Sequence, residues 1–258
     1  MFIDKHLICV KTLTDSHLEE FMRCPYKFYH QKILKIHSGL NWRQVVQLSV
    51  NKIVKEYFQT PVSHRSSHQI LVLIDKYWRP ITVDLFDSKA HYYSVLAKVS
   101  DHLLQFLIKE KNHEPPLFLN EKLNVFVDEL DMNLSVSFQV AEWSKNSFVV
   151  KKYLLESTPS FLQAFRNMIV VFSKKAFNKL PEKIEAYSLM NNKVIEFFPQ
   201  EADVEKAMFD LKLTKIVFTD RKSYKQFTNS DECTVCPLKR ECDHGHPLSE
   251  KRQTILYM

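Results

Sequence analysis

The chain has 258 residues, a formal net charge of +6 and a hydrophobic fraction of 45%, so it can fold around a substantial core. It contains only two glycines, which excludes the glycine-rich loops that bind nucleotide phosphates, and we expect no nucleotide cofactor. The uninterrupted apolar stretches are far shorter than the roughly 20 residues of a membrane span, and the first residues lack a signal-peptide pattern, which predicts a cytoplasmic protein without a membrane partner.

Helical patterns dominate the N-terminal part of the chain. Ser16 and Glu19 have the spacing of a capping box, which predicts a helix start at Ser16. Pro25, directly after Cys24, suits the first turn of a second helix. Apolar side chains then recur at three- and four-residue steps, which predicts further helices at residues 42–58, 67–78 and 88–111.

The pattern changes to period two after the proline pair at 115 and 116. We predict strands at 119–127, 133–143 and 147–155, a helix at 161–177, strands at 184–189 and 193–198, and a helix at 202–211. This order indicates an α/β protein with an α+β-like succession, in which helices flank a central mixed sheet. We expect one domain over residues 1–258, with a helical insertion at about 42–112, a sheet core at about 117–200 and a cysteine-rich segment at about 228–246.

Three cysteines near the C-terminus have metal-ligand spacing. Cys233, Cys236 and Cys242 form a C-x2-C-x5-C pattern, which lets the thiolates converge on one metal centre. A tetrahedral metal or a cluster needs a fourth ligand. Cys24 is the best thiol candidate, because Pro25 fixes the chain direction beside it. A histidine two or four residues after Cys242 is the local alternative, so the residues leave both an iron–sulfur cluster and Zn²⁺ open.

The stretch from Leu13 to Tyr29, in which Cys24 and Pro25 precede Phe28 in a C-P-x-x-F motif, resembles the opening of iron–sulfur nucleases of the RecB and AddB type. These nucleases belong to the PD-(D/E)XK superfamily. Their C-P-x-x-F cysteine joins a C-terminal C-x2-C-x5-C in binding a [4Fe–4S] cluster. The resemblance therefore implies a PD-(D/E)XK core and a [4Fe–4S] cluster that joins the two ends of the chain. The implied cluster ligands are Cys24, Cys233, Cys236 and Cys242.

The resemblance also implies positions for a metal-dependent active site, and these positions carry the wrong residues. The family's helical histidine falls at Gln47, its strand aspartate at Ala141, and its Asp-x-Lys pair at Lys151 and Tyr153. Alanine and lysine cannot coordinate Mg²⁺, and a lysine ammonium repels it. We therefore expect a nuclease fold whose catalytic site is degenerate, and lean towards a protein that is not an enzyme.

Remnants of an active site are an alternative. A register one residue away would supply Glu142 and Lys152, and the family's glutamine on the following helix is kept at Gln163. These residues keep open an active Mg²⁺- or Mn²⁺-dependent DNA nuclease with a non-standard site. A zinc-stabilised interaction protein is the second alternative.

A basic run before the cysteine triplet points to nucleic acid. Arg221, Lys222 and Lys225 can attract phosphates, and Tyr224 can stack on unpaired bases, although a solvated loop has the same composition. The expected partners are single-stranded DNA or duplex ends, or a helicase or recombination protein in DNA repair.

Overall fold

The computed structural model describes residues 10–36, 39–109 and 114–224, together with Cys233, Cys236, Leu238 and Cys242. The N-terminal elements are β1 (Thr12–Thr14), α1 (Asp15–Arg23), α2 (Pro25–Phe28), α3 (Trp42–Gln59), α4 (Ser67–Trp78) and α5 (Lys89–Ile108). They are followed by β2 (Phe118–Val127), β3 (Met132–Trp143), β4 (Phe148–Leu154), α6 (Pro159–Phe177), β5 (Lys183–Ser188), β6 (Lys193–Phe197) and α7 (Glu201–Thr219).

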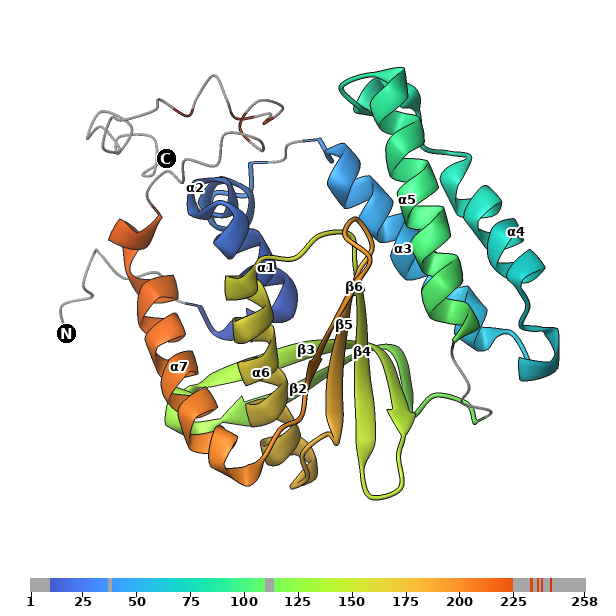
Figure 1. The fold of residues 1–258 in the computed structure, drawn as a ribbon. Coiled ribbons are helices and arrows are strands. Elements are labelled where there is room, and N and C mark those ends of the chain that lie inside the picture. The colour runs from blue at the N-terminus through green and yellow to red at the C-terminus, as the bar shows by residue number, and fades with distance from the viewer. Residues whose placement is uncertain are drawn as a thin grey trace.

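The strands form one mixed sheet of six strands between two helical layers. The order is β1-β3-β4-β5-β6, with β2 also paired to β3; β1–β3 and β4–β5 are parallel, and the other pairs are antiparallel. Helices α1, α6 and α7 cover one face, and α3, α4 and α5 cover the other (Figure 1). Side chains alternate between the two faces along β4. Val150 packs in the core under α1, α6 and α7, and Tyr153 packs in the core under α3, α4 and α5. The predicted mixed sheet flanked by helices is confirmed.

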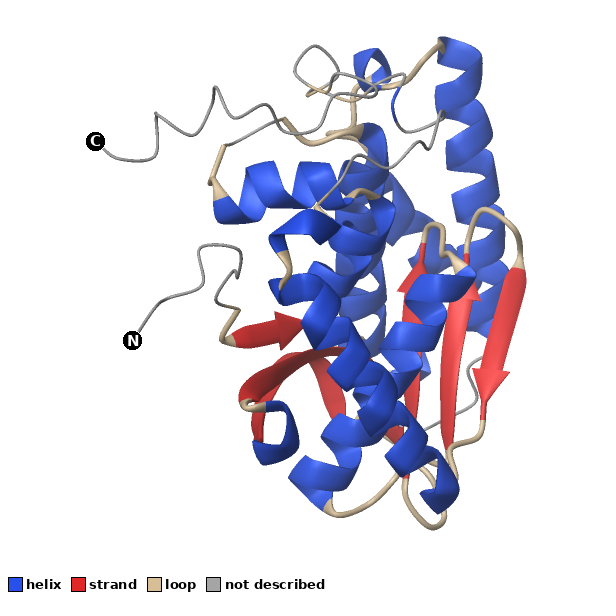
Figure 2. Ribbon diagram, turned by 90° about the vertical axis from the view of Figure 1, so that its left-hand side faces the viewer, coloured by secondary structure: helices blue, strands red, loops and turns tan. Residues whose placement is uncertain are grey.

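The sheet splits along one edge of β3. Strand β2 pairs with β3 from Met132 to Ala141, so β1 and β4 must share the opposite edge. There β1 pairs only with residues 133–135, and β4 only with residues 140–143. Figures 1 and 2 show the consequence, because β2 and β3 are turned strongly away from β4, β5 and β6. The middle of β3 therefore borders a wedge between two strands, and side chains must satisfy its backbone there.

Two local predictions at the ends of elements are wrong. Helix α1 is capped by Thr14, whose hydroxyl accepts the His17 N–H at 2.9 Å, whereas Ser16 lies inside the helix. Helix α7 continues to Thr219, eight residues beyond the predicted end at 211. Strand β1, with only three residues, was not predicted. The start of α2 at Pro25 is confirmed. None of the helices in the described ranges is both long and apolar enough to cross a membrane.

Candidate functional site

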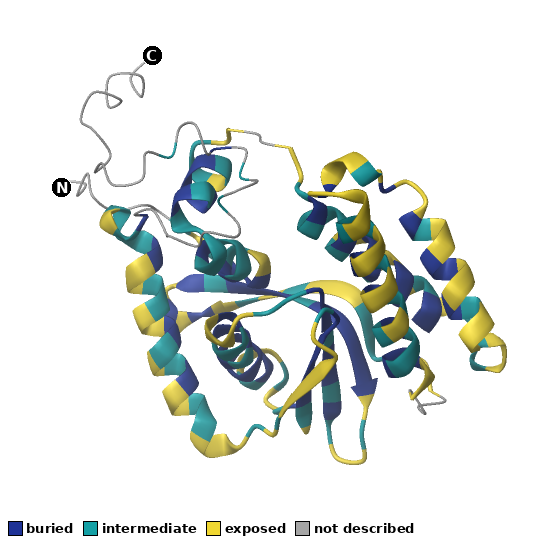
Figure 3. Ribbon diagram, turned by 45° about the horizontal axis from the view of Figure 1, so that its top comes forward, coloured by how far each residue is buried: buried dark blue, intermediate teal, exposed yellow. Residues whose placement is uncertain are grey.

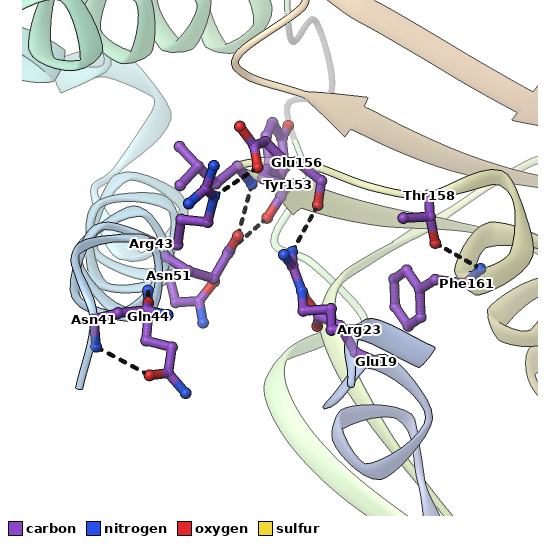
Figure 4. Close-up of polar contacts among 12 residues, drawn as sticks. Glu19, Arg23, Asn41, Arg43, Gln44, Asn51, Tyr153, Glu156, Thr158 and Phe161 are labelled. Atoms are coloured by element: carbon purple, nitrogen blue, oxygen red, sulfur yellow. Dashed lines mark hydrogen bonds and ion pairs between the residues drawn. The ribbon is translucent and has the colours of Figure 1, made fainter. Parts of the chain in front are cut away.

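A network of neutral amides fills the wedge between α3, β3 and β4. The Gln47 amide accepts the Leu155 N–H at 2.7 Å, and it donates to the Tyr153 carbonyl at 2.9 Å. The Gln139 amide accepts the Tyr153 N–H at 2.6 Å. Both glutamines also donate to the Asn51 side-chain oxygen, at 2.9 and 3.0 Å. The network thus joins a helix to two strands through the backbone of β4. Figure 4 labels two of its members, Asn51 of α3 and Tyr153 of β4.

These amides take the place of a neighbouring strand. The β3–β4 ladder ends at Val140 and Lys151, whereas β4 pairs with β5 as far as Leu154 on its other edge. Gln47 and Gln139 therefore supply the hydrogen bonds that β3 no longer offers to β4. Their oxygens already accept backbone N–H groups, and they lack the negative charge with which carboxylates bind a divalent cation.

Sequence reasoning found only part of this network. Gln47, at the position of the family's helical histidine, belongs to the network, and the backbone of Tyr153 takes part in it. Ala141, at the position of the strand aspartate, does not, because it packs in the core on the α6 side of the sheet. Gln139 is the β3 side chain that reaches the wedge. Asn51 was also missed, although its spacing of four residues from Gln47 places both on one side of α3.

The proposed remnants of an active site are not brought together. Lys151 Nζ lies 2.5 Å from Glu142 Oε2, and both side chains are buried. Lys152 points to the opposite face of the sheet, where its ammonium lies 2.7 Å from Asp15 Oδ2 and over the ring of Phe165. Glu142 and Lys152 thus cannot act on one metal ion. The interpretation that they form a single site is wrong.

Gln163 lies on the side of α6 that faces α7. Its amide donates to Asn167 at 3.2 Å, and the Asn167 amide donates to Asp210 of α7 at 2.9 Å. Because α6 and α3 cover opposite faces of the sheet, Gln163 is separated from the amide network.

A cleft of about 600 Å³ lies between the N-terminal helices and α3, with Gln47 and Leu155 of the wedge in its lining. The segment after β4 ties the two walls together. Arg43 of α3 donates to the Glu156 carboxylate at 2.9 Å, and Arg23 of α1 donates to the Glu156 carbonyl at 3.3 Å (Figure 4). The cleft therefore leads from the surface to the amide network.

Positive charge prevails in this cleft. Its lining contains four cationic residues and only two carboxylates: Arg23, Lys27, Lys32 and Arg43 against Glu19 and Glu20. Glu19 pairs with Arg23 at 3.3 Å and Glu20 with Lys32 at 3.0 Å. In the part of the chain that the structure describes, Lys27 has no ion-pair partner.

Cys24 also lines the cleft. Its Sγ caps α2 by accepting the Lys27 N–H at 3.4 Å, and the thiol is half-buried. Cys233, Cys236 and Cys242 are half-buried as well, and none of the four cysteines is in a disulfide. Four accessible thiols fit the donor chemistry of a [4Fe–4S] cluster or of Zn²⁺. Across residues 10–36, 39–109 and 114–224 and the four isolated C-terminal positions, however, no three His, Cys, Asp or Glu side chains are arranged around a metal position.

An aromatic cluster joins the end of α7 to the helices that flank Cys24. Phe218 lies 4.2 Å from Phe21 and 5.5 Å from Phe28, measured between ring centroids. Tyr224 stacks on Phe28 at 6.1 Å and contacts Tyr29 at 5.3 Å. This joint brings residue 224, nine positions before Cys233, beside the segment that carries Cys24.

Two residues of the run that was predicted to bind nucleic acid, Arg221 and Tyr224, contact this joint. Tyr224 is 1% exposed, its hydroxyl donates to the Phe218 carbonyl at 2.7 Å, and burial raises its pKa to about 12. The prediction that Tyr224 stacks on bases is therefore wrong. Arg221 is half-buried and lies 3.4 Å from the Tyr29 hydroxyl, and Lys222 is exposed. Lys225, like most of the predicted cluster segment at about 228–246, lies outside the described residues.

Among the solved structures that match this chain is one that is similar over nearly its whole length. It is the crystal structure of a protein from Eubacterium rectale described as a "putative exonuclease", which covers 96% of this chain and 94% of its own, with a TM-score of 0.50 and 9% sequence identity. No protein-family model and no curated protein matches the sequence. At this identity the likeness shows the fold alone. The mixed sheet flanked by helices thus fits a nuclease-type core.

Proposed function

We propose that this chain is a catalytically degenerate PD-(D/E)XK nuclease-fold protein that holds a [4Fe–4S] cluster and binds DNA or a DNA-repair partner. The observation that carries the loss of catalysis is the amide network of Gln47, Asn51 and Gln139. It occupies the junction of α3, β3 and β4, where the family resemblance implies carboxylates and a histidine.

The chemistry of that junction supports a structural role. The network's side-chain oxygens accept hydrogen bonds inside the protein, and the buried Lys151 ammonium nearby is neutralised by Glu142. A divalent cation would need several negatively charged oxygen ligands, whereas the amides carry no charge and the Glu142 carboxylate is paired with Lys151.

The aromatic joint supports the cluster as a clip between the chain ends. It holds residue 224 beside α2, the helix that Cys24 caps. The remaining nine positions before Cys233 span at most about 30 Å when extended, so the two cysteine groups are within reach of each other. The four thiolates would hold the cluster and thereby couple its binding to folding.

The cleft is the best candidate surface for DNA. Of its four cationic side chains, Arg23, Lys32 and Arg43 are paired with carboxylates. The Lys27 ammonium therefore supplies the uncompensated charge that can attract a phosphate. In the run 221–224, Tyr224 is buried in the aromatic joint and Arg221 is half-buried. The cleft therefore replaces this run as the main DNA-binding surface in the proposal.

Hydrolysis of labelled single- and double-stranded DNA with Mg²⁺ or Mn²⁺ tests the loss of catalysis. We expect no cleavage above that of a mock preparation. Cleavage that co-purifies with the chain and disappears in Glu142→Gln, which preserves the shape of the side chain, would overturn the degenerate site.

Iron and acid-labile sulfide analysis after anaerobic purification tests the cofactor. We expect both elements in the equal proportions of a [4Fe–4S] cluster, in a brown protein. A colourless protein with stoichiometric zinc would replace this proposal with a zinc-stabilised interaction protein.

Fluorescence anisotropy with a labelled single strand tests the cleft. Lys27→Glu should weaken binding and reduce its salt dependence, because one phosphate contact is lost. Lys98→Glu, on the exposed side of α5 and outside the cleft, makes the same charge change and should leave the affinity nearly unchanged. Equal effects of the two variants would rule out the cleft as the binding surface.

A further inference from the structure

Helix α7 is apolar on two sides. Ala207, Leu211 and Phe218 face the interior and are buried. Four large apolar side chains follow one another on the outward side: Phe209 at 60%, Leu213 at 46%, Ile216 at 61% and Val217 at 43% exposure. Figure 3 shows exposed segments recurring along the length of this helix.

This outward row departs from the usual pattern of a surface helix, whose solvent side is polar. Phe209, Leu213 and Ile216 are spaced by four and then three residues, which is the spacing of a helix–helix seam. A contiguous row of large exposed apolar side chains marks an interaction surface. We call the row Phe209, Leu213, Ile216 and Val217 the α7 seam.

The charges beside the α7 seam are self-complementary. Glu205 and Lys212 are exposed and lie seven residues apart, so they share one flank of the seam, one on each side of Phe209. Two charged side chains of α7 that face the rest of the molecule form hydrogen bonds there. Asp210 accepts from the Asn167 amide, and Lys215 donates to the Leu130 carbonyl. Neither Glu205 nor Lys212 makes an ion pair within the described residues, although Lys212 is close enough to Glu129 to help lower the pKa of that carboxyl.

We infer that the α7 seam is the interface between two copies of this chain, whose α7 helices cross antiparallel near Phe209. An antiparallel pair brings the same flank of both helices together. Glu205 of each copy then lies beside Lys212 of the other. The twofold axis passes close to Phe209, which meets its own copy, and Ile216 faces the exposed Ala202 of the other copy. A single surface thereby supplies both halves of a closed, isologous contact, as a symmetric dimer requires.

The position of α7 agrees with this pairing. The helix is the outermost element of its layer, beyond α6, and it runs along the side of the molecule opposite to α3, α4 and α5 (Figure 1). The cleft at Cys24 and the amide network do not contribute residues to the α7 seam. A dimer through the α7 seam therefore does not use the residues proposed to bind the cluster or DNA.

Sedimentation velocity of the full chain, over about 1 to 100 μM, tests the inference. We expect a concentration-dependent dimer. Phe209→Glu combined with Ile216→Glu should give a monomer over this range, with an unchanged circular dichroism spectrum because both side chains are exposed. Leu71→Glu on α4, where the side chain is 49% exposed, is the matched control and should remain dimeric.

Charge reversal tests the orientation. Glu205→Lys and Lys212→Glu should each weaken the dimer, because each places like charges opposite each other twice. An equimolar mixture of these two variants should recover a heterodimer with at least tenfold tighter association than either variant alone. A wild-type chain that stays monomeric throughout the range, or a mixture that gains nothing, would overturn the inference.

Discussion

The two ends of the cleft differ in how their polar and apolar groups are used. At the wedge, Gln47 and Gln139 act as substitutes for a strand, and their hydrogen bonds are directed at the backbone of β4. At the opposite end, Cys24 lies next to a joint of aromatic rings that joins α1 and α2 to the end of α7. The first region is lined by neutral amides whose oxygens already accept hydrogen bonds, whereas the second presents the half-buried Cys24 thiol.

This difference separates residues that the fold itself requires from residues that point to a function. The split of the sheet needs hydrogen-bonding groups at the wedge whatever the protein does, since unsatisfied buried backbone groups are costly. Amides meet that need without binding a cation. The joint between the chain ends has no such requirement for sulfur, because aromatic packing already holds α7 against α1 and α2. The Cys24 thiol beside the joint is therefore a stronger indication of function than the amides are.

The largest expected effect on stability comes from replacing the cysteines proposed to bind the cluster. If both cysteines bind one cluster, as proposed, Cys24→Ser and Cys233→Ser should each abolish cluster binding. Each should also lower the melting temperature by about 10 °C or more, and by similar amounts. Thermal unfolding and iron content, measured anaerobically on both variants, check this. If Cys24→Ser keeps the iron and the melting temperature of the parent protein, the clip between the chain ends does not exist.

A smaller effect should come from the amide network. Gln47→Leu removes the partners of the Leu155 N–H and the Tyr153 carbonyl, and should lower the free energy of unfolding by about 3 kcal/mol. Gln163→Leu, which loses a bond only to the Asn167 side chain, should cost less than about 1 kcal/mol. Urea unfolding monitored by circular dichroism compares the two. Equal losses would contradict the structural role assigned to the wedge.

The smallest effect should be a pH dependence from His17 on α1. Burial, reinforced by the charge of Lys32, lowers the pKa of His17 below its ordinary value of 6.5. Below pH 6.5 the unfolded state therefore binds a proton that the folded state resists, and stability should fall as the pH drops from 7 towards 5.

His17→Gln should reduce that fall, although other groups will contribute to the total. The measurement is the free energy of unfolding of both proteins at pH 7 and pH 5.5. A variant with the same pH dependence as the parent would show that the His17 environment contributes nothing.

The candidate site was only partly predictable from the sequence, for reasons that particular residues make clear. Gln47 could be placed because its helix has a clear periodicity. Gln139 could not, because the face it occupies depends on where the β3–β4 ladder ends, and a shift of one residue moves a side chain to the other side of a sheet. The same uncertainty produced the assignment of Ala141 and the joint use of Glu142 and Lys152. Tyr224 resembled an exposed stacking residue because its partners, Phe28 and Tyr29, lie almost two hundred positions earlier.

The sequence by itself determined the succession of helices and strands, the C-x2-C-x5-C pattern and the exclusion of glycine-rich nucleotide loops. These features depend on residues that are near neighbours along the chain. Only the tertiary structure decided that β1 and β4 share one edge of β3, that amides fill the resulting wedge, that a cleft leads there from Cys24 and that α7 keeps an exposed apolar seam. Each of these depends on strand pairing and packing between segments far apart in sequence, which local periodicity does not encode.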